Sequence, residues 1–139
     1  MSIQQTDVLY TAVATAENGR DGRVATDDGT LDVVVNPPKE MGGTGTGTNP
    51  EQLFAAGYSA CFQGALAVVA RQEKTDITGS TVTAKVGIGK NADGFGLIVE
   101  ISANIPNLPP TEARALLAKA HQVCPYSKAT KGNITVTLT

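Results

Sequence analysis

The feature that most constrains the fold is residues 48–74, TNPEQLFAAGYSACFQGALAVVARQEK, whose composition is typical of one long helix. From residue 53 to 70 nearly every side chain is apolar or small, and only Ser59 and Gln63 interrupt the run. Pro50 suits the first helical turn, where a missing N–H is tolerated. A helix that is apolar all round is expected to be buried on all sides. The run is too short and its residues too small for a membrane span, so we expect a core helix.

Small residues repeat along this predicted helix at intervals of four. Ala56, Ala60 and Gly64 form one stripe, and Cys61 lies on the stripe beside it. Residues four apart share a helix face, and small side chains let another backbone approach closely. The stripe therefore predicts a seam for a partner helix, with Cys61 close to it.

Before the helix, three short β-rich segments are expected at residues 8–16, 23–26 and 31–35. The dipeptides Asn18-Gly19 and Asp28-Gly29 between them are strong turn signals. The N-terminal third is therefore predicted to be a small antiparallel meander.

Residues 36–48 contain the run GGTGTGT and form a loop leading into the long helix. The glycines before a helix N-terminus are a weak signal for phosphate binding. No parallel βαβ pattern surrounds them and no Walker lysine follows, so a flexible or packing loop is the favoured interpretation.

After the helix, alternating apolar residues predict strands at 80–90 and 95–105, and a last strand at 133–139. A second helix is expected at residues 111–123, ended by Pro125. The order βββ–α–ββ–α–β, with neighbouring strands antiparallel, indicates an α+β fold. At 139 residues the chain is expected to be a single domain, residues 1–139.

Charge and composition narrow the function. The net charge of −2 and the aromatic content of 4% argue against nucleic acid as a partner. The opening MSIQQTDVLY lacks a charged region followed by an apolar one, so we expect no signal peptide and a cytoplasmic protein. In that compartment two cysteines favour a catalytic, redox or metal role over a structural disulfide. The alternative is that both are small buried apolar residues.

The two cysteines have unequal settings. Cys61 lies inside an apolar helix, where burial alone raises a thiol pKa, so reactivity requires a positive partner and access to solvent. Cys124 stands at a helix end, directly before Pro125. His121 is three residues before Cys124 and could share a metal with both cysteines. However, structural zinc needs four ligands and catalytic zinc usually three plus water, and His121 is the only histidine, with no carboxylate at obvious ligand spacing. A Cys–His hydrolase is a third hypothesis. It is weak because no orienting Asp or Asn is evident and hydrolysis would not need a second cysteine. His121 is better interpreted as a satisfied structural histidine.

Three segments together carry a family resemblance: NGRDGRV at residues 18–24, GGTGTGTNPEQLFAAGYSACF at 42–62, and HQVCPYSKATKGNITVTL at 121–138. They resemble organic hydroperoxide resistance proteins, the Ohr branch of the Ohr/OsmC thiol-peroxidase family. The similarity runs nearly end to end, and VCPYS distinguishes this branch from OsmC proper.

The resemblance implies a peroxidase without metal or cofactor that reduces alkyl and fatty-acid hydroperoxides in oxidative-stress defence. By the match, Cys61 is the peroxidatic cysteine, Cys124 is the resolving cysteine, and Arg20 and Glu51 are the active-site arginine and glutamate. It also implies re-reduction by a dithiol of the lipoyl type on a partner protein. The implied fold is an intertwined homodimer in which sheets enclose two long central helices, with active sites at the subunit interface and no membrane involvement.

Several details stay open at this level. Arg20 could be a solvated hairpin residue and Glu51 a simple first-turn acid, and Arg23 is a second arginine candidate. Apolar side chains near the predicted nucleophile would favour organic peroxides over hydrogen peroxide. These candidates for substrate contact are Leu53, Phe54, Tyr58 and Phe62. The alternatives in function are an OsmC-type peroxidase of different substrate preference and a non-enzymatic thiol redox sensor.

The spacing of Glu51 and Cys61 predicts a site built from two chains. Ten residues on one helix correspond to about 15 Å along its axis, too far for a carboxylate to serve its own thiol. We therefore expect Glu51 of one chain to lie beside Cys61 of another.

Overall fold

The structure, a computed structural model, describes residues 3–139. The chain divides into two compact units, one ending at Pro50 and the other running from Glu51 to Thr139. Strands and helices follow the predicted α+β order, with a 3₁₀ turn and a short third helix in addition.

The first unit holds a three-stranded antiparallel sheet, in which β1 (Ala14–Glu17), β2 (Gly22–Thr26) and β3 (Asp32–Val35) are neighbours in chain order. Asn18 and Gly19 have φ values of 59° and 55°, the left-handed conformation that the Asn-Gly signal predicts. The predicted strand at 8–16 is wrong in extent. β2 ends at Thr26, which pairs with Ala14, so β2 offers no partner to the residues before Ala14.

The glycine-rich loop after β3 turns back on that strand. It contains a 3₁₀ turn, η1 (Lys39–Met41), and then returns so that the Thr48 N–H donates to the Val34 carbonyl. The Asn36 N–H in turn donates to the Thr48 carbonyl. The loop therefore closes against β3 before the long helix begins, as expected of a packing loop.

The second unit combines one sheet with three helices. Its elements are α1 (Pro50–Gln72), β4 (Thr81–Asn91), β5 (Gly94–Asn104), α2 (Pro110–Val123), α3 (Pro125–Thr130) and β6 (Val136–Leu138). β4 and β5 form the predicted antiparallel hairpin. β6 pairs parallel to β5, with Val99 opposite Val136. The expectation of antiparallel neighbours is wrong here, because α2 and α3 carry the chain back across the sheet before β6.

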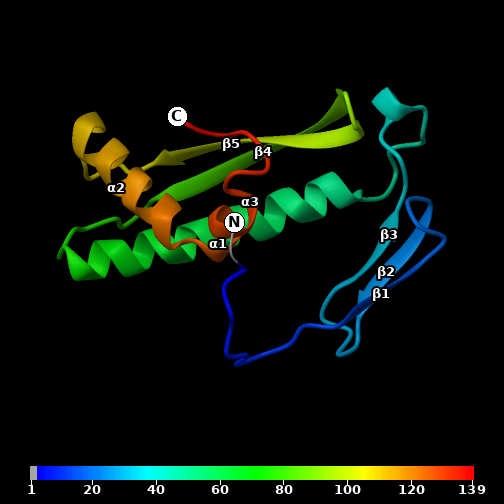
Figure 1. Ribbon diagram of the computed structural model, residues 1–139, viewed down its shortest axis with the longest axis horizontal. Helices are drawn as coiled ribbons and strands as arrows, with labels where there is room; N and C mark the ends of the chain where they lie inside the picture. The colour runs from blue at the N-terminus through cyan, green and yellow to red at the C-terminus, as the bar shows by residue number, and fades with distance from the viewer. Residues whose placement is uncertain (1–2) are drawn as a thin grey trace. The chain divides into compact units, whose positions relative to one another are not determined.

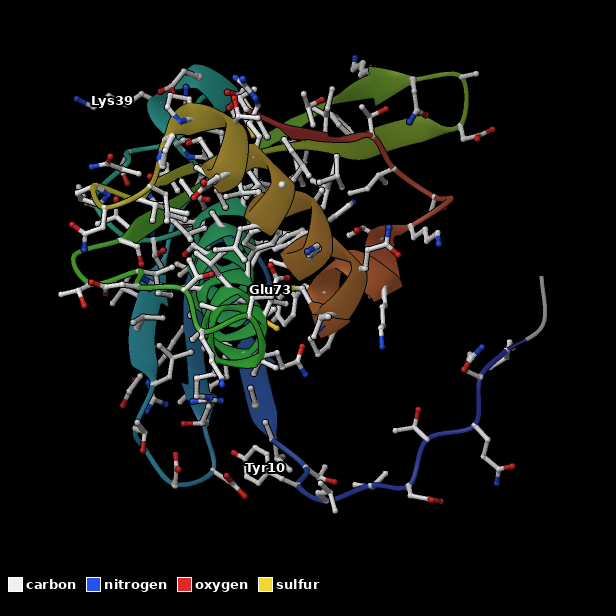
Figure 2. The ribbon with its side chains drawn as sticks, turned by 90° about the vertical axis from the view of Figure 1, so that its left-hand side faces the viewer. Tyr10, Lys39 and Glu73 are labelled. Carbon is white, nitrogen blue, oxygen red and sulfur yellow. The ribbon has the colours of Figure 1, made fainter. Side chains whose placement is uncertain are left out.

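α1 runs along the sheet of the second unit, and their facing side chains form its core (Figure 1). The inward positions of β4 and β5 follow the predicted alternation of apolar residues. The fully buried large side chains of the core include Tyr58, Phe62, Leu66, Val99 and Ile101. Just after the end of α1, Glu73 forms an ion pair with Lys119 of α2, in which Nζ and Oε2 are 2.7 Å apart. Figure 2 looks onto this end of the helix.

One face of α1 is exposed in this chain. Ala56, Ala60 and Gly64 are exposed, and a Cβ added at Gly64 would meet nothing within 4 Å. The expectation of burial on all sides is therefore wrong for the single chain, because the sheet and helices of its unit cover only the opposite face. By length and composition α1 could also cross a membrane, a property that core helices share.

Candidate active site

The fold brings the two thiols together. Cys61 lies in the middle of α1 and Cys124 at the junction of α2 and α3, and the Cys124 thiol donates to the Cys61 sulfur over 3.7 Å. Both cysteines are free. Cys124 is fully buried, whereas Cys61 is only partly buried. The pair is thus close enough for disulfide chemistry, and Cys61 is the member that solvent can reach.

Cys124 owes its position to the proline that follows it. Its backbone is extended, with φ −60° and ψ 122°, as expected of a residue before proline. α2 ends at Val123, and Pro125 then occupies the first turn of α3, where it is tolerated. The sequence predicts only a helix end at Pro125, whereas in the structure this proline also begins α3. The thiol therefore projects from a kink between two helices.

The surroundings of Cys61 disfavour its thiolate. Burial raises the pKa of the Cys61 thiol above its ordinary value, and the neighbouring Cys124 thiol raises it further. The backbone N–H of Tyr126 bonds to the sulfur and acts in the opposite direction. These effects sum to a raised pKa, so a reactive thiolate requires an additional positive charge.

An aromatic cluster lines the turn of α1 that precedes Cys61. The ring centroids of Tyr58 and Tyr126 lie 5.6 Å apart, and Phe54 lies about edge-on to both at 6.1 and 6.2 Å. Gly57 leaves room for this arrangement, because a Cβ there would lie 2.7 Å from the Tyr126 Oη. The absence of a side chain at Gly57 thus leaves space for the Tyr126 ring. The backbone N–H of the same tyrosine bonds to the Cys61 sulfur.

The predicted substrate contacts divide into two kinds. Leu53 and Phe54 are partly buried and keep some exposed surface. Tyr58 and Phe62 are fully buried. They belong to the core of the second unit, since α1 turns them toward the sheet and α2, and they offer no surface to a ligand in this chain.

The helices that carry the two cysteines also share a buried polar cluster, which the sequence pattern does not reveal. The Ser127 hydroxyl is 2.8 Å from the Tyr58 hydroxyl and 2.7 Å from Nδ1 of His121. Thr130 lies 3.3 Å from the same tyrosine oxygen. The interpretation of His121 as a satisfied structural histidine agrees with this bond. Ser127 stands in the VCPYS segment, but its partners come from other elements, which spacing alone does not indicate.

The charged candidates come from different parts of the chain. Arg20 is exposed in the loop between β1 and β2, and Glu51 occupies the first turn of α1. Arg23 is engaged by Asp32, whose two carboxylate oxygens accept from its Nε and Nη2 at 2.7 Å each. Because α1 is continuous from Pro50 to Gln72, Glu51 and Cys61 of one chain are about 15 Å apart along the axis.

A metal site would require several ligand side chains to gather at one point. In the part of the chain that the structure describes, residues 3–139, no three or more His, Cys, Asp or Glu side chains gather closely enough to hold a metal ion.

Comparison with known proteins gives a consistent picture. The family described as OsmC-like protein matches residues 43–139. An organic hydroperoxide resistance protein of Xanthomonas axonopodis pv. citri is 54% identical over 134 residues, which cover 95% of this chain and 94% of that protein. The organic hydroperoxide resistance protein OhrB of Bacillus subtilis is 45% identical over 132 residues, covering 94% of this chain and 96% of that protein.

Solved structures agree with these relatives. The chain is similar to an organic hydroperoxide resistance protein from Elizabethkingia anophelis, with a TM-score of 0.90, 54% identity and 96% of each chain covered. It is also similar to a putative one from Vibrio cholerae with captopril bound in one of its active sites. That match has a TM-score of 0.90 and 50% identity, and covers 97% of this chain and 94% of the other.

Proposed function

Because the chain belongs to the OsmC-like family, and its relatives are named for organic hydroperoxide resistance, we propose that it is a cysteine-based peroxidase acting on organic hydroperoxides. The observation that carries this proposal is the pair of free thiols 3.7 Å apart, one partly open and one buried. A thiol that is oxidised by peroxide needs such a partner to be rescued as a disulfide.

The reaction balances with these two thiols and a reductant. The Cys61 thiolate attacks one peroxide oxygen, the O–O bond breaks, and the organic fragment leaves as an alcohol after protonation. Cys61 then carries a sulfenic acid. The Cys124 sulfur attacks the Cys61 sulfur, the S–O bond breaks, and the oxygen leaves as water with the thiol proton. A dithiol of the lipoyl type, carried by a partner protein, reduces the disulfide by exchange.

We assign to Arg20 the positive charge that a Cys61 thiolate requires. A guanidinium near the sulfur would favour the thiolate and orient the peroxide. Glu51 would hold that guanidinium in a bidentate pair. Since Glu51 cannot reach Cys61 along its own helix, the site is assembled in a homodimer. The exposed stripe of Ala56, Ala60 and Gly64 supports a seam between two α1 helices.

The substrate class follows from the apolar surroundings of Cys61. Leu53 and Phe54 would contact the organic tail, while Tyr58 and Phe62 shape the site from beneath. Burying apolar surface contributes about 25 cal/mol per Å², so alkyl and fatty-acid hydroperoxides gain affinity that hydrogen peroxide does not. We place this activity in the cytoplasm, as part of defence against oxidative stress, in a single domain spanning residues 1–139.

The test is multiple-turnover consumption of tert-butyl hydroperoxide with lipoyl dithiol present, compared with glutathione and thioredoxin. A peroxidase consumes many equivalents, and tert-butyl hydroperoxide should react faster than hydrogen peroxide. Equal second-order rate constants for the two peroxides would indicate an OsmC-type enzyme of different preference. Oxidation that stops after one equivalent, with every reductant, would indicate a redox sensor.

A further inference from the structure

The Ser127 hydroxyl links its own helix, α3, to α1 and α2. The hydroxyl bonds to His121 in the last turn of α2 and to Tyr58 on α1. Within α3, the Ser127 carbonyl accepts a hydrogen bond from the Thr130 hydroxyl at 3.0 Å. Ser127, Tyr58 and Thr130 are all buried. No buried side-chain nitrogen or oxygen among residues 3–139 lacks a partner, so the cluster is fully satisfied.

The placement of this cluster relative to Cys124 is specific. His121 and Ser127 lie three residues on either side of Cys124, so their 2.7 Å bond spans the kink from which the thiol projects. Tyr58 lies three residues before Cys61, which is about one turn of α1. One hydroxyl therefore fixes the angle of the kink and ties the kink to the turn that carries the other thiol.

We propose that Ser127, with His121 and Tyr58, positions Cys124 for attack on oxidised Cys61. This inference rests on the proposed function and adds three positioning residues to it. None of the three exchanges a proton or electron with the substrate. They act by holding one sulfur at the right distance and direction from the other.

The disulfide step is the step that depends on this alignment. The two sulfurs must close from 3.7 Å to about 2.05 Å and adopt a dihedral near 90°. While they are apart, a second peroxide can oxidise the sulfenic acid to a sulfinic acid, which a dithiol does not reduce. A loose kink therefore slows resolution and increases over-oxidation, without changing the first reaction of Cys61 with peroxide.

The hydrogen-bond chemistry of the cluster allows small, matched changes. A serine hydroxyl donates one hydrogen bond and accepts others, so it can donate to His121 Nδ1 while accepting from the Tyr58 hydroxyl. Ser127→Ala removes both contacts of this hydroxyl. Tyr58→Phe removes one of them, together with the longer 3.3 Å contact to Thr130, and keeps the bond across the kink. Ser59→Ala is the control, because it removes a hydroxyl from the next position of α1, where that hydroxyl donates to the Ala56 carbonyl of the same helix.

The experiment separates the two oxidation steps by quenching after one equivalent of tert-butyl hydroperoxide. We expect Ser127→Ala to form sulfenic acid at the wild-type rate. Its disulfide should form about tenfold more slowly, the scale set by losing buried hydrogen bonds, and sulfinic acid should accumulate. Tyr58→Phe should show a smaller effect in the same direction, and Ser59→Ala none.

A second arm needs no peroxide. Equilibration with a glutathione redox buffer measures the tendency of Cys61 and Cys124 to form their disulfide, which should fall about tenfold in Ser127→Ala. If wild-type protein ignores peroxide, the proposed function fails while this arm still tests the cluster. Wild-type disulfide formation in both hydroxyl variants, or equal slowing of both oxidation steps, would overturn the positioning role.

Discussion

The Cys124 thiol donates to the Cys61 sulfur across 3.7 Å, although 63 residues separate the two in sequence. The relationship is asymmetric. Cys124 is fully buried at a kink between helices, and Cys61 is partly open on a continuous helix. Solvent can therefore reach Cys61 but not Cys124 in this chain, which supports the different roles proposed for the two thiols.

Cys61→Ser should abolish peroxide consumption, because the attacking sulfur is gone. Cys124→Ser should consume one equivalent and stop, leaving a sulfenic acid at Cys61 that no neighbouring thiol resolves. Mass spectrometry after one equivalent of peroxide measures both outcomes, with the wild-type disulfide as the reference. An unmodified Cys61 in the Cys124→Ser protein would reverse the assignment of roles.

Arg20→Ala should slow the reaction with peroxide by about a hundredfold, the scale of losing one preorganised electrostatic contact. Burial already raises the pKa of Cys61. The pKa should rise further in this variant, because the positive charge that stabilises the thiolate is gone, and the alkylation rate against pH measures the change. Arg23→Ala is the matched control. Its side chain is an exposed partner of Asp32, so its loss should leave turnover near wild type. If Arg23→Ala slowed peroxide turnover and Arg20→Ala did not, Arg23 rather than Arg20 would be the active-site arginine.

His121 should make stability depend on pH. Burial, and then the nearby Lys131, lower the pKa of His121 below its ordinary value of 6.5. Between the lowered pKa of the folded state and the ordinary value, His121 is therefore protonated in the unfolded chain but mostly neutral in the folded chain. Stability from this group is complete above about pH 6.5 and is lost as pH falls below it. Urea unfolding from pH 7.5 to 5 should show that loss in wild type and less of it in His121→Asn. Identical slopes would remove His121 as the cause.

Much of the fold was predictable because its signals are local. The apolar run of α1, the alternation in β4 and β5, and the Asn-Gly turn each depend on neighbouring residues alone. The length of β1 was not predictable, since the strand continues only as far as β2 can pair with it. The parallel pairing of β6 likewise depends on where α2 and α3 return the chain.

The site shows the same division. Cys61 and Cys124 stand out by residue type and motif, so the sequence alone is enough to propose them. Ser127 was missed because its importance comes from Tyr58 on α1 and His121 on α2, which only tertiary packing brings to it. Apolar residues such as Tyr58 and Phe62 were predicted to contact substrate, but a helix in the core must turn some of them inward.

Gly57 should be required for the seat of Tyr126. Replacing an interior helix glycine with alanine normally stabilises by about 1 kcal/mol. Here the new Cβ would lie 2.7 Å from the Tyr126 Oη, so Gly57→Ala should instead destabilise the wild-type protein by about 1 kcal/mol. In a Tyr126→Ala background the same substitution should recover its stabilising effect. Chemical denaturation of the four proteins measures the coupling, and additive effects would show that the ring does not depend on Gly57.

The active site should require two chains. α1 is unbroken from Pro50 to Gln72, so Glu51 stands about 15 Å along the axis from its own Cys61, while Ala60 and Gly64 expose a face on which a second α1 can pack. Cys61→Ser and Glu51→Ala chains, each inactive alone, should therefore complement one another when refolded together. Each mixed dimer contains one intact site of two, so random pairing should restore about a quarter of wild-type activity. Size-exclusion chromatography with differently tagged chains verifies the mixed dimers, and refolding each variant alone is the control. Verified mixed dimers without activity, or a fully active monomer, would contradict the shared site.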